Sequence, residues 1–137
     1  EIRPGNYVFY DYKQVKLGVT KLDRVSLFVI SQVISRPEKD RVLIDAGSKV
    51  LSLDYILEGD EKVYGYILEH PNAKIYNLSE EHGWVRINED SKIKIGEKIT
   101  IIPVHSCLVI NNFDYFYFIK ESEIIEKIKI DARGLFE

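Results

Sequence analysis

His105 and Cys107 are separated by a single residue and follow Pro103-Val104. In an extended segment, side chains two positions apart project to the same face, so both could reach one metal ion. Imidazole and thiolate form a donor pair that favours zinc over magnesium or calcium. Two protein ligands are fewer than a closed structural zinc site needs, so a metal held here would keep positions for water or substrate. The spacing alone favours the alternative of a buried core thiol beside a hydrogen-bonded histidine, because free cysteines are usually buried.

A second polar cluster, Ser79-Glu80-Glu81-His82-Gly83, lies between two apolar runs. Carboxylates beside an imidazole can orient a base or support a metal ligand, so Glu81 and His82 are candidates for a supporting catalytic role. The simpler alternative is a solvated turn in front of a strand.

A third candidate is the segment around Gly5, Asn6 and Tyr7. A glycine followed by a small polar residue can expose backbone N–H groups that bind phosphate, although an ordinary Pro-Gly turn has the same composition. The stretch from Asp45 to Lys49 lacks the spacing of a nucleotide-binding phosphate loop, so we do not expect nucleotide binding there.

The elements that must position these residues are predicted to be short strands. Apolar and β-branched runs separated by turn residues every 8–12 positions favour an all-β sandwich or barrel-like domain. Residues 25–34 are dense in apolar side chains, which predicts a strand buried on both faces. Residues 48–57 are compatible with a loop or a short helix. The predicted extended segments are residues 7–10, 25–34, 41–45, 63–68, 74–78, 84–87, 92–95, 98–102, 104–110, 115–119 and 124–130, with the last two completing the core.

Composition limits the function classes. A chain of 137 residues suits one domain, and a single cysteine excludes an internal disulfide. The net charge of −3 argues against a nucleic-acid-binding barrel. Neither a membrane span nor a secretory signal is present, so we expect a cytoplasmic protein. The chain has no methionine and opens on a strand-like segment, so we expect part of a longer polypeptide.

Six motifs, taken in order, resemble the C-terminal part of the D-serine dehydratase and D-threonine aldolase family. The resemblance implies a mainly β, sandwich- or barrel-like domain of an alanine racemase-like enzyme. Residues 1–11 would then end the α/β barrel that binds pyridoxal phosphate, and residues 12–137 would form the β-rich domain. The motifs are RPGNYVFYD (residues 3–11), VISRP (33–37), IDAGSKVLSLD (44–54), LSEEHG (78–83), IGEKITIIPVHSC (95–107) and DARG (131–134).

The same resemblance implies roles for the candidate residues. His105 and Cys107 would hold zinc, Gly5, Asn6 and Tyr7 would contact the pyridoxal phosphate group, and Glu81 and His82 would support the site. The activity implied is a lyase acting on D-β-hydroxy amino acids, by dehydration of D-serine or retro-aldol cleavage of D-threonine.

The partners implied are the enzyme's own N-terminal barrel, a small D-amino acid and a second copy in a homodimer, with no nucleic acid or membrane. The Schiff-base lysine would lie in that barrel, so this chain alone is expected to be inactive. The alternative is a stand-alone all-β metal-binding or interaction module without catalysis.

Overall fold

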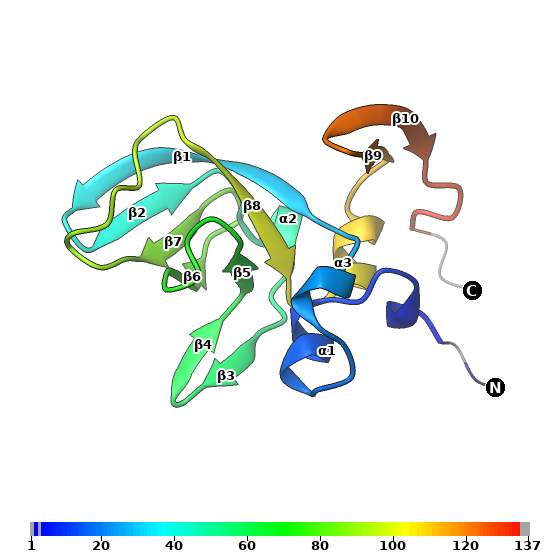
Figure 1. The fold of residues 1–137 in the computed structure, drawn as a ribbon, viewed down its shortest axis with the longest axis horizontal. Helices are drawn as coiled ribbons and strands as arrows, with labels where there is room; N and C mark the ends of the chain where they lie inside the picture. Colours follow the sequence, from blue (N-terminus) through cyan, green and yellow to red (C-terminus); the bar gives the residue numbers. More distant parts are fainter. Residues whose placement is uncertain (1, 3, 135–137) are drawn as a thin grey trace.

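Six antiparallel strands form the main sheet in the order β5–β8–β1–β2–β7–β6 (Figure 1). The computed structural model describes residue 2 and residues 4–134. The sheet curls until its two edges meet, where the Tyr64 amide donates to the Ile75 carbonyl at 2.9 Å. The mainly β, barrel-like fold is therefore confirmed. The strands are β1 (Val29–Glu38), β2 (Arg41–Ile44), β5 (Gly65–Ile67), β6 (Lys74–Leu78), β7 (Gly83–Arg86) and β8 (Lys98–Pro103).

Two hairpins and several short helical turns surround this sheet. The hairpins are β3 (Ile56–Glu58) with β4 (Glu61–Val63), and β9 (Tyr115–Lys120) with β10 (Glu123–Lys129). The helical elements are η1 (Asn6–Val8), α1 (Tyr12–Lys16), η2 (Leu22–Arg24), α2 (Ser48–Leu51) and α3 (Ser106–Asn111). No helix in the described part of the chain has the length and apolar character needed to cross a membrane.

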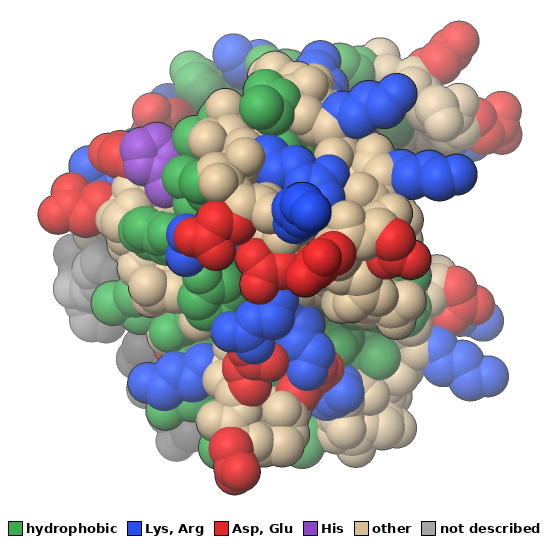
Figure 2. Space-filling view, turned by 90° about the vertical axis from the view of Figure 1, so that its left-hand side faces the viewer, with side chains coloured by type: hydrophobic (Ala, Val, Ile, Leu, Met, Phe, Trp, Pro, Cys, Tyr) green, Lys and Arg blue, Asp and Glu red, His purple; other side chains and the backbone are tan. Residues whose placement is uncertain are grey.

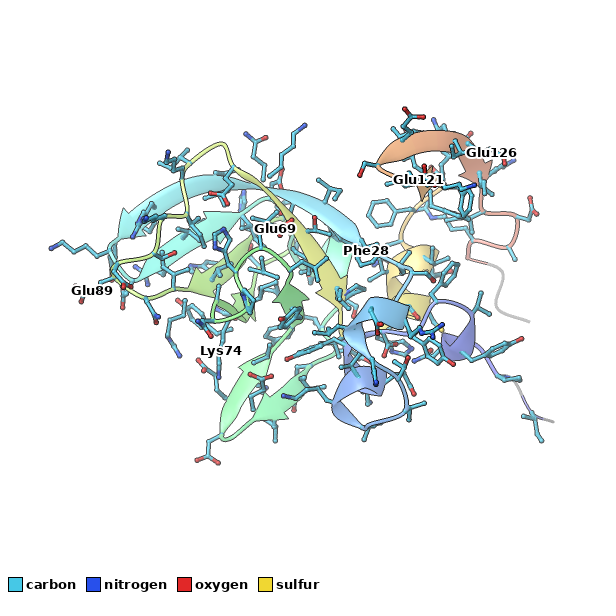
Figure 3. The ribbon with its side chains drawn as sticks, in the orientation of Figure 1. Phe28, Glu69, Lys74, Glu89, Glu121 and Glu126 are labelled. Carbon is cyan, nitrogen blue, oxygen red and sulfur yellow. The ribbon has the colours of Figure 1, made fainter. Side chains whose placement is uncertain are left out.

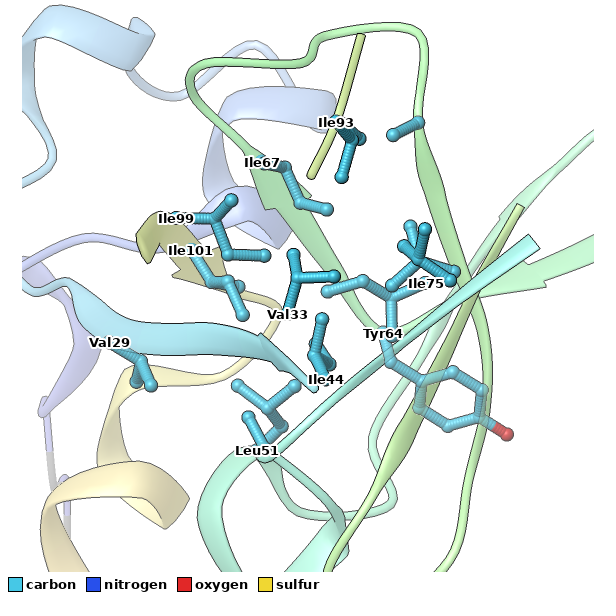
Figure 4. Packing of buried hydrophobic residues seen from close by; sticks show 14 of the residues in the cluster. Val29, Val33, Ile44, Leu51, Tyr64, Ile67, Ile75, Ile93, Ile99 and Ile101 are labelled. Atoms are coloured by element: carbon cyan, nitrogen blue, oxygen red, sulfur yellow. The ribbon is translucent and has the colours of Figure 1, made fainter. Parts of the chain in front are cut away.

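The barrel interior is filled mainly by isoleucine and valine side chains (Figure 4). Ile44, Ile75, Ile101 and Val85 are fully buried. Their side chains come from β2, β6, β8 and β7, so strands far apart in sequence share one core. A smaller cluster joins Ile102 and Val104 to α1 through Tyr12.

Strand β1 differs from the expectation of burial on both faces. Val29, Ser31 and Val33 are buried, whereas Ile30 and Ile34 are exposed by 60 % and 40 %. The strand alternates with a period of two because only one face of the sheet meets the core. The two-sided prediction was wrong because sheet packing, not apolar density, decides which side chains are covered.

Two other segments predicted to be extended have a different structure. Residues 92–95 form no strand, and the Arg36 guanidinium instead donates to the Ser91 and Ile93 carbonyls at 3.0 Å each. The extended run predicted for residues 104–110 is interrupted by helix α3. Residues 7–10, also predicted to be extended, overlap the 3₁₀ turn η1.

The β9–β10 hairpin does not complete the core as predicted. Ile119 and Ile124 are exposed by 53 % and 66 %, and the hairpin stands apart from the barrel (Figure 1). Glu121 in the turn of the hairpin and Glu126 on β10 are labelled in Figure 3. A two-stranded hairpin has too little surface to bury its apolar side chains alone.

The charged surface shows no basic stripe on the face seen in Figure 2. Acidic and basic side chains interleave there. The predicted division between residues 1–11 and 12–137 remains a prediction, and Arg3 of its first segment lies outside the described residues.

Candidate functional site

His105 stands immediately before α3, as the residue at its N-terminal cap. Its Nδ1 lies 2.7 Å from the Asp54 Oδ2. An ionised carboxylate only accepts hydrogen bonds, so a neutral imidazole in this contact has its proton on Nδ1 and the lone pair that a metal ion would use on Nε2. A carboxylate in this position is the usual outer partner of a metal-binding histidine. The sequence-based search did not select Asp54, although this residue ends the IDAGSKVLSLD motif.

Cys107 lies in the first turn of α3, with an exposed side chain. Its thiol donates to the Asn6 Oδ1 at 2.7 Å, across about a hundred residues of sequence. A Cβ atom added to Gly5 would lie only 3.1 Å from Cys107 Sγ, tighter than most such contacts. Glycine therefore lets the N-terminal segment approach the thiol closely.

The geometric basis of the predicted pair was wrong, because His105 and Cys107 do not lie on one extended strand. His105 has an extended backbone at the helix cap, whereas Cys107 is helical. Within residues 2 and 4–134, no group of three or more His, Cys, Asp or Glu side chains is arranged to hold a metal ion. A metal bound by this pair therefore needs further ligands from water, substrate or another part of the protein.

Gly5, Asn6 and Tyr7 form the entry and first turn of η1. The Gly5 and Asn6 carbonyls accept from the Val8 and Tyr10 amides at 3.2 and 2.7 Å. The first amides of a helical turn have no preceding turn to bond to, so the Asn6 and Tyr7 N–H groups are the donors this segment can offer a phosphate. The structure thus brings the predicted phosphate segment against the predicted metal ligand Cys107.

Glu81 and His82 lie elsewhere, in the loop between β6 and β7, and both are exposed. Glu81 forms an ion pair with Lys49. The loop carbonyls of Ser79 and Glu80 accept from the Ser48 and Lys49 amides at 2.8 and 3.1 Å, so the loop caps the start of α2. The described contacts join Glu81 to Lys49 of α2 and His82 to Ser79 of its own loop, and none of them reaches His105 or Cys107.

A hollow of about 290 Å³ opens beside Cys107. Its wall combines the N-terminal segment, α3 and the chain end that carries the DARG motif. Arg133 is held there by an ion pair with Asp114. The lining residues are Gly5, Val8, Phe9, Cys107, Ile110, Asn111, Ile130, Ala132 and Arg133.

Residues 26–119 match the family model described as "Putative serine dehydratase domain". The chain belongs to this serine dehydratase domain family. It is 38 % identical to the D-serine dehydratase of Dictyostelium discoideum over 94 % of this chain and 36 % of that protein. It thus spans about a third of that relative.

A second relative is similar in size to this chain. The chain is 30 % identical to the uncharacterized protein Rv1414 of Mycobacterium tuberculosis, over 90 % of this chain and 96 % of that protein. The domain family therefore occurs both inside a D-serine dehydratase and as a short protein.

Solved structures show the same fold. D-threonine aldolase from Filomicrobium marinum superposes with a TM-score of 0.80 at 27 % identity, over 96 % of this chain and 36 % of that one. A cysteine-to-alanine variant of a D-threo-3-hydroxyaspartate dehydratase, solved in its metal-free form, superposes with a TM-score of 0.79 at 23 % identity, over 91 % of this chain and 37 % of that one. The serine dehydratase domain family thus includes, or shares its fold with, domains of enzymes that act on D-hydroxy amino acids.

Proposed function

We propose that this chain is the C-terminal, metal-binding part of a pyridoxal phosphate- and zinc-dependent lyase acting on D-β-hydroxy amino acids. The observation that carries the proposal is His105, oriented by Asp54, beside an exposed Cys107 thiol at the start of one helix. The named relatives support the substrate class, since they act on D-serine, D-threonine or hydroxyaspartate.

His105 and Cys107 are residue types that bind zinc, but two ligands are fewer than the four positions of a zinc site. Imidazole nitrogen and thiolate sulfur suit zinc, and the remaining positions would be left for water or substrate, as in catalytic sites. The metal-free form of the hydroxyaspartate dehydratase implies that this enzyme binds a metal. His105 and Cys107 are the residues of this chain that would hold the ion.

When bound, zinc would polarise the β-hydroxyl of the substrate and pyridoxal phosphate would withdraw electrons from its α-carbon. The residues of this chain would hold and orient these groups. Asp54 keeps the His105 ring in one tautomer, and the η1 turn offers the Asn6 and Tyr7 amides to a phosphate group. We extend the proposal to a barrel domain outside this chain that supplies the Schiff-base lysine, and to a homodimer. The proposal covers both possible reactions, D-serine dehydration and D-threonine cleavage.

A second candidate is a stand-alone metal-binding module without catalysis. The mycobacterial relative favours it, because 96 % of that protein is covered by this chain. Both candidate functions use His105 and Cys107 to bind a metal. A measurement of catalytic activity therefore distinguishes them, whereas a measurement of metal binding does not.

The decisive experiment measures zinc binding and lyase activity together. Zinc is titrated into the 137-residue chain in competition with a chromogenic chelator. We expect His105→Ala and Cys107→Ala to lose most of the affinity and His70→Ala, a histidine that pairs with Glu97 outside the candidate site, to retain it. Zinc affinity unchanged in both ligand variants would contradict the metal site.

Activity is then assayed on the full-length protein with pyridoxal phosphate, zinc and either D-serine or D-threonine. The lyase proposal expects keto acid or aldehyde from one of them. It also expects borohydride reduction to label no lysine in the 137-residue chain stoichiometrically. If a full-length protein that binds zinc lacks both activities, the stand-alone module is correct.

A further inference from the structure

Asp11 is a carboxylate that the proposed function has not yet used. Its side chain is completely buried, although aspartate is rarely buried without partners. It accepts three hydrogen bonds: from the Gln14 amide at 3.0 Å, from the Asn6 Nδ2 at 2.8 Å and from the Ser106 amide at 3.1 Å. The first is an ordinary helix cap for α1. Of the other two, one comes from Asn6, five residues earlier in the chain, and one from Ser106, 95 residues later.

These two hydrogen bonds hold groups next to the candidate metal ligands. Ser106 is the residue between His105 and Cys107, so its amide fixes the backbone from which both side chains project. Asn6 donates to Asp11 and accepts from the Cys107 thiol at 2.7 Å. Because a carboxylate cannot donate, it forces the NH₂ group of Asn6 toward Asp11 and its carbonyl oxygen toward Cys107. Asp11 therefore selects one of the two possible amide orientations.

We propose that Asp11 is a positioning residue whose buried carboxylate orients the Asn6 amide toward Cys107 and fixes the backbone between the two zinc ligands. The inference rests on the proposed zinc site, which it deepens. It also joins the predicted phosphate segment to the metal-binding turn through one residue, so a displacement on either side is transmitted to the other.

Two substitutions separate this role from helix capping. Asp11→Ser keeps a strong capping oxygen for the Gln14 amide but is too short to reach Asn6. Asp11→Asn keeps the size but replaces one accepting oxygen by an NH₂ group. Tyr12→Phe is the matched control, because it removes a hydrogen bond from the same helix without touching Asn6 or Ser106.

The first readout is the side-chain amide of Asn6 in ¹⁵N–¹H NMR spectra of the metal-free chain, assigned with Asn6→Ala. We expect one NH₂ proton to be shifted downfield and protected from exchange in the wild type and in Tyr12→Phe. Both Asp11 variants should return it to the position of a solvated amide. A solvated signal in the wild type, or an unchanged signal in Asp11→Ser, would overturn the proposal. If the variants fail to fold, the wild-type spectrum alone still shows whether the Asn6 NH₂ group is hydrogen-bonded.

The second readout is zinc affinity in the chelator competition. Loss of an outer partner of a metal site costs about tenfold or more, so both Asp11 variants should bind zinc about tenfold more weakly, with Tyr12→Phe unchanged. An affinity equal to that of the wild type would also overturn the proposal. If the wild type binds no zinc, the proposed zinc site fails while the NMR result still decides the orientation of Asn6.

Discussion

At the scale of residues, the candidate site depends on two carboxylates that make different contacts. Asp54 bonds a ring nitrogen of His105, and Asp11 bonds backbone and amide groups around Cys107. One carboxylate orients a ligand side chain, and the other orients the main chain that carries it.

Replacing Asp54 by Asn should weaken zinc binding by about tenfold or more, since a neutral amide holds the His105 tautomer less strongly. Chelator competition measures the affinity, and ¹⁵N spectra of the ring report the tautomer. Asp60→Asn, an exposed change outside the site, is the control. Equal zinc affinity in Asp54→Asn and the wild type would mean that Asp54 does not support the metal.

Glu58 shows how a charged network affects stability away from the site. Burial alone would raise its pKa, but hydrogen bonds from Tyr12 and Lys16 and the nearby lysine charges lower it to about 2. The Lys74 Nζ, whose residue is labelled in Figure 3, lies 3.4 Å from the Glu58 Oε2. Because the folded-state pKa is lowered, ionised Glu58 stabilises the fold above the ordinary value of 4.5, and this contribution is lost as the pH falls toward 2.

Glu58→Gln should therefore lower the free energy of unfolding at pH 7 by up to about 3 kcal/mol and flatten its dependence on pH between 4.5 and 2. Urea denaturation across that range measures both effects. Glu126→Gln, on the exposed hairpin, should leave the profile unchanged. A wild-type stability that is flat between pH 4.5 and 2 would show that Glu58 is not held ionised.

At the scale of elements, the β6–β7 loop and α2 are fitted closely together at Gly47. A Cβ atom there would lie 2.4 Å from the Glu80 carbonyl oxygen and 2.6 Å from the Glu81 carbonyl carbon. Both are backbone atoms that a rotamer change cannot move. The LSEEHG motif thus has a structural role in seating α2, whatever further part Glu81 and His82 take in the proposed reaction.

Gly47→Ala should destabilise the chain by about 2–3 kcal/mol, because inserted atoms force backbone shifts. Urea denaturation measures the loss. Gly59→Asn controls for the loss of a glycine as such: a Cβ there meets nothing within 4 Å, and Asn tolerates the positive φ of 66°. A Gly47→Ala variant as stable as the control would show that the loop moves away freely.

At the scale of the whole molecule, stability is concentrated in the barrel and the candidate site lies at its margin. The apolar core is enclosed by the six-stranded sheet (Figure 4), whereas α3 and the hairpin after it lie to one side of that sheet (Figure 1). The exposed apolar side chains of the hairpin contribute little to folding. They are available to the barrel domain that we propose for the longer protein.

Truncating a barrel residue should therefore cost far more than truncating a hairpin residue. Ile101→Ala is expected to lower the free energy of unfolding by about 2–5 kcal/mol, because Ile101 is fully buried. Ile124→Ala, at a position 66 % exposed, should change it by less than about 0.5 kcal/mol. A large loss in Ile124→Ala would show that the hairpin packs against this chain in solution.

The sequence by itself determined the β class and most strand positions, and it predicted His105 and Cys107 as candidate metal ligands. Alternating apolar residues and turn signals report which residues can pair in a sheet, and a cysteine near a histidine is visible from residue type alone. The motifs also predicted the family, which the comparisons confirm. These features depend on side-chain type and local spacing.

Only the tertiary structure decided which polar groups meet. The contacts of Asn6 with Cys107 and of Asp54 with His105 join residues 101 and 51 positions apart, and no local pattern encodes them. The fold also turned residues 106–111 into a helix and left the β9–β10 hairpin outside the core. Long-range packing chooses among locally possible conformations, so the partners of a buried carboxylate such as Asp11 emerge only when the sheet has closed.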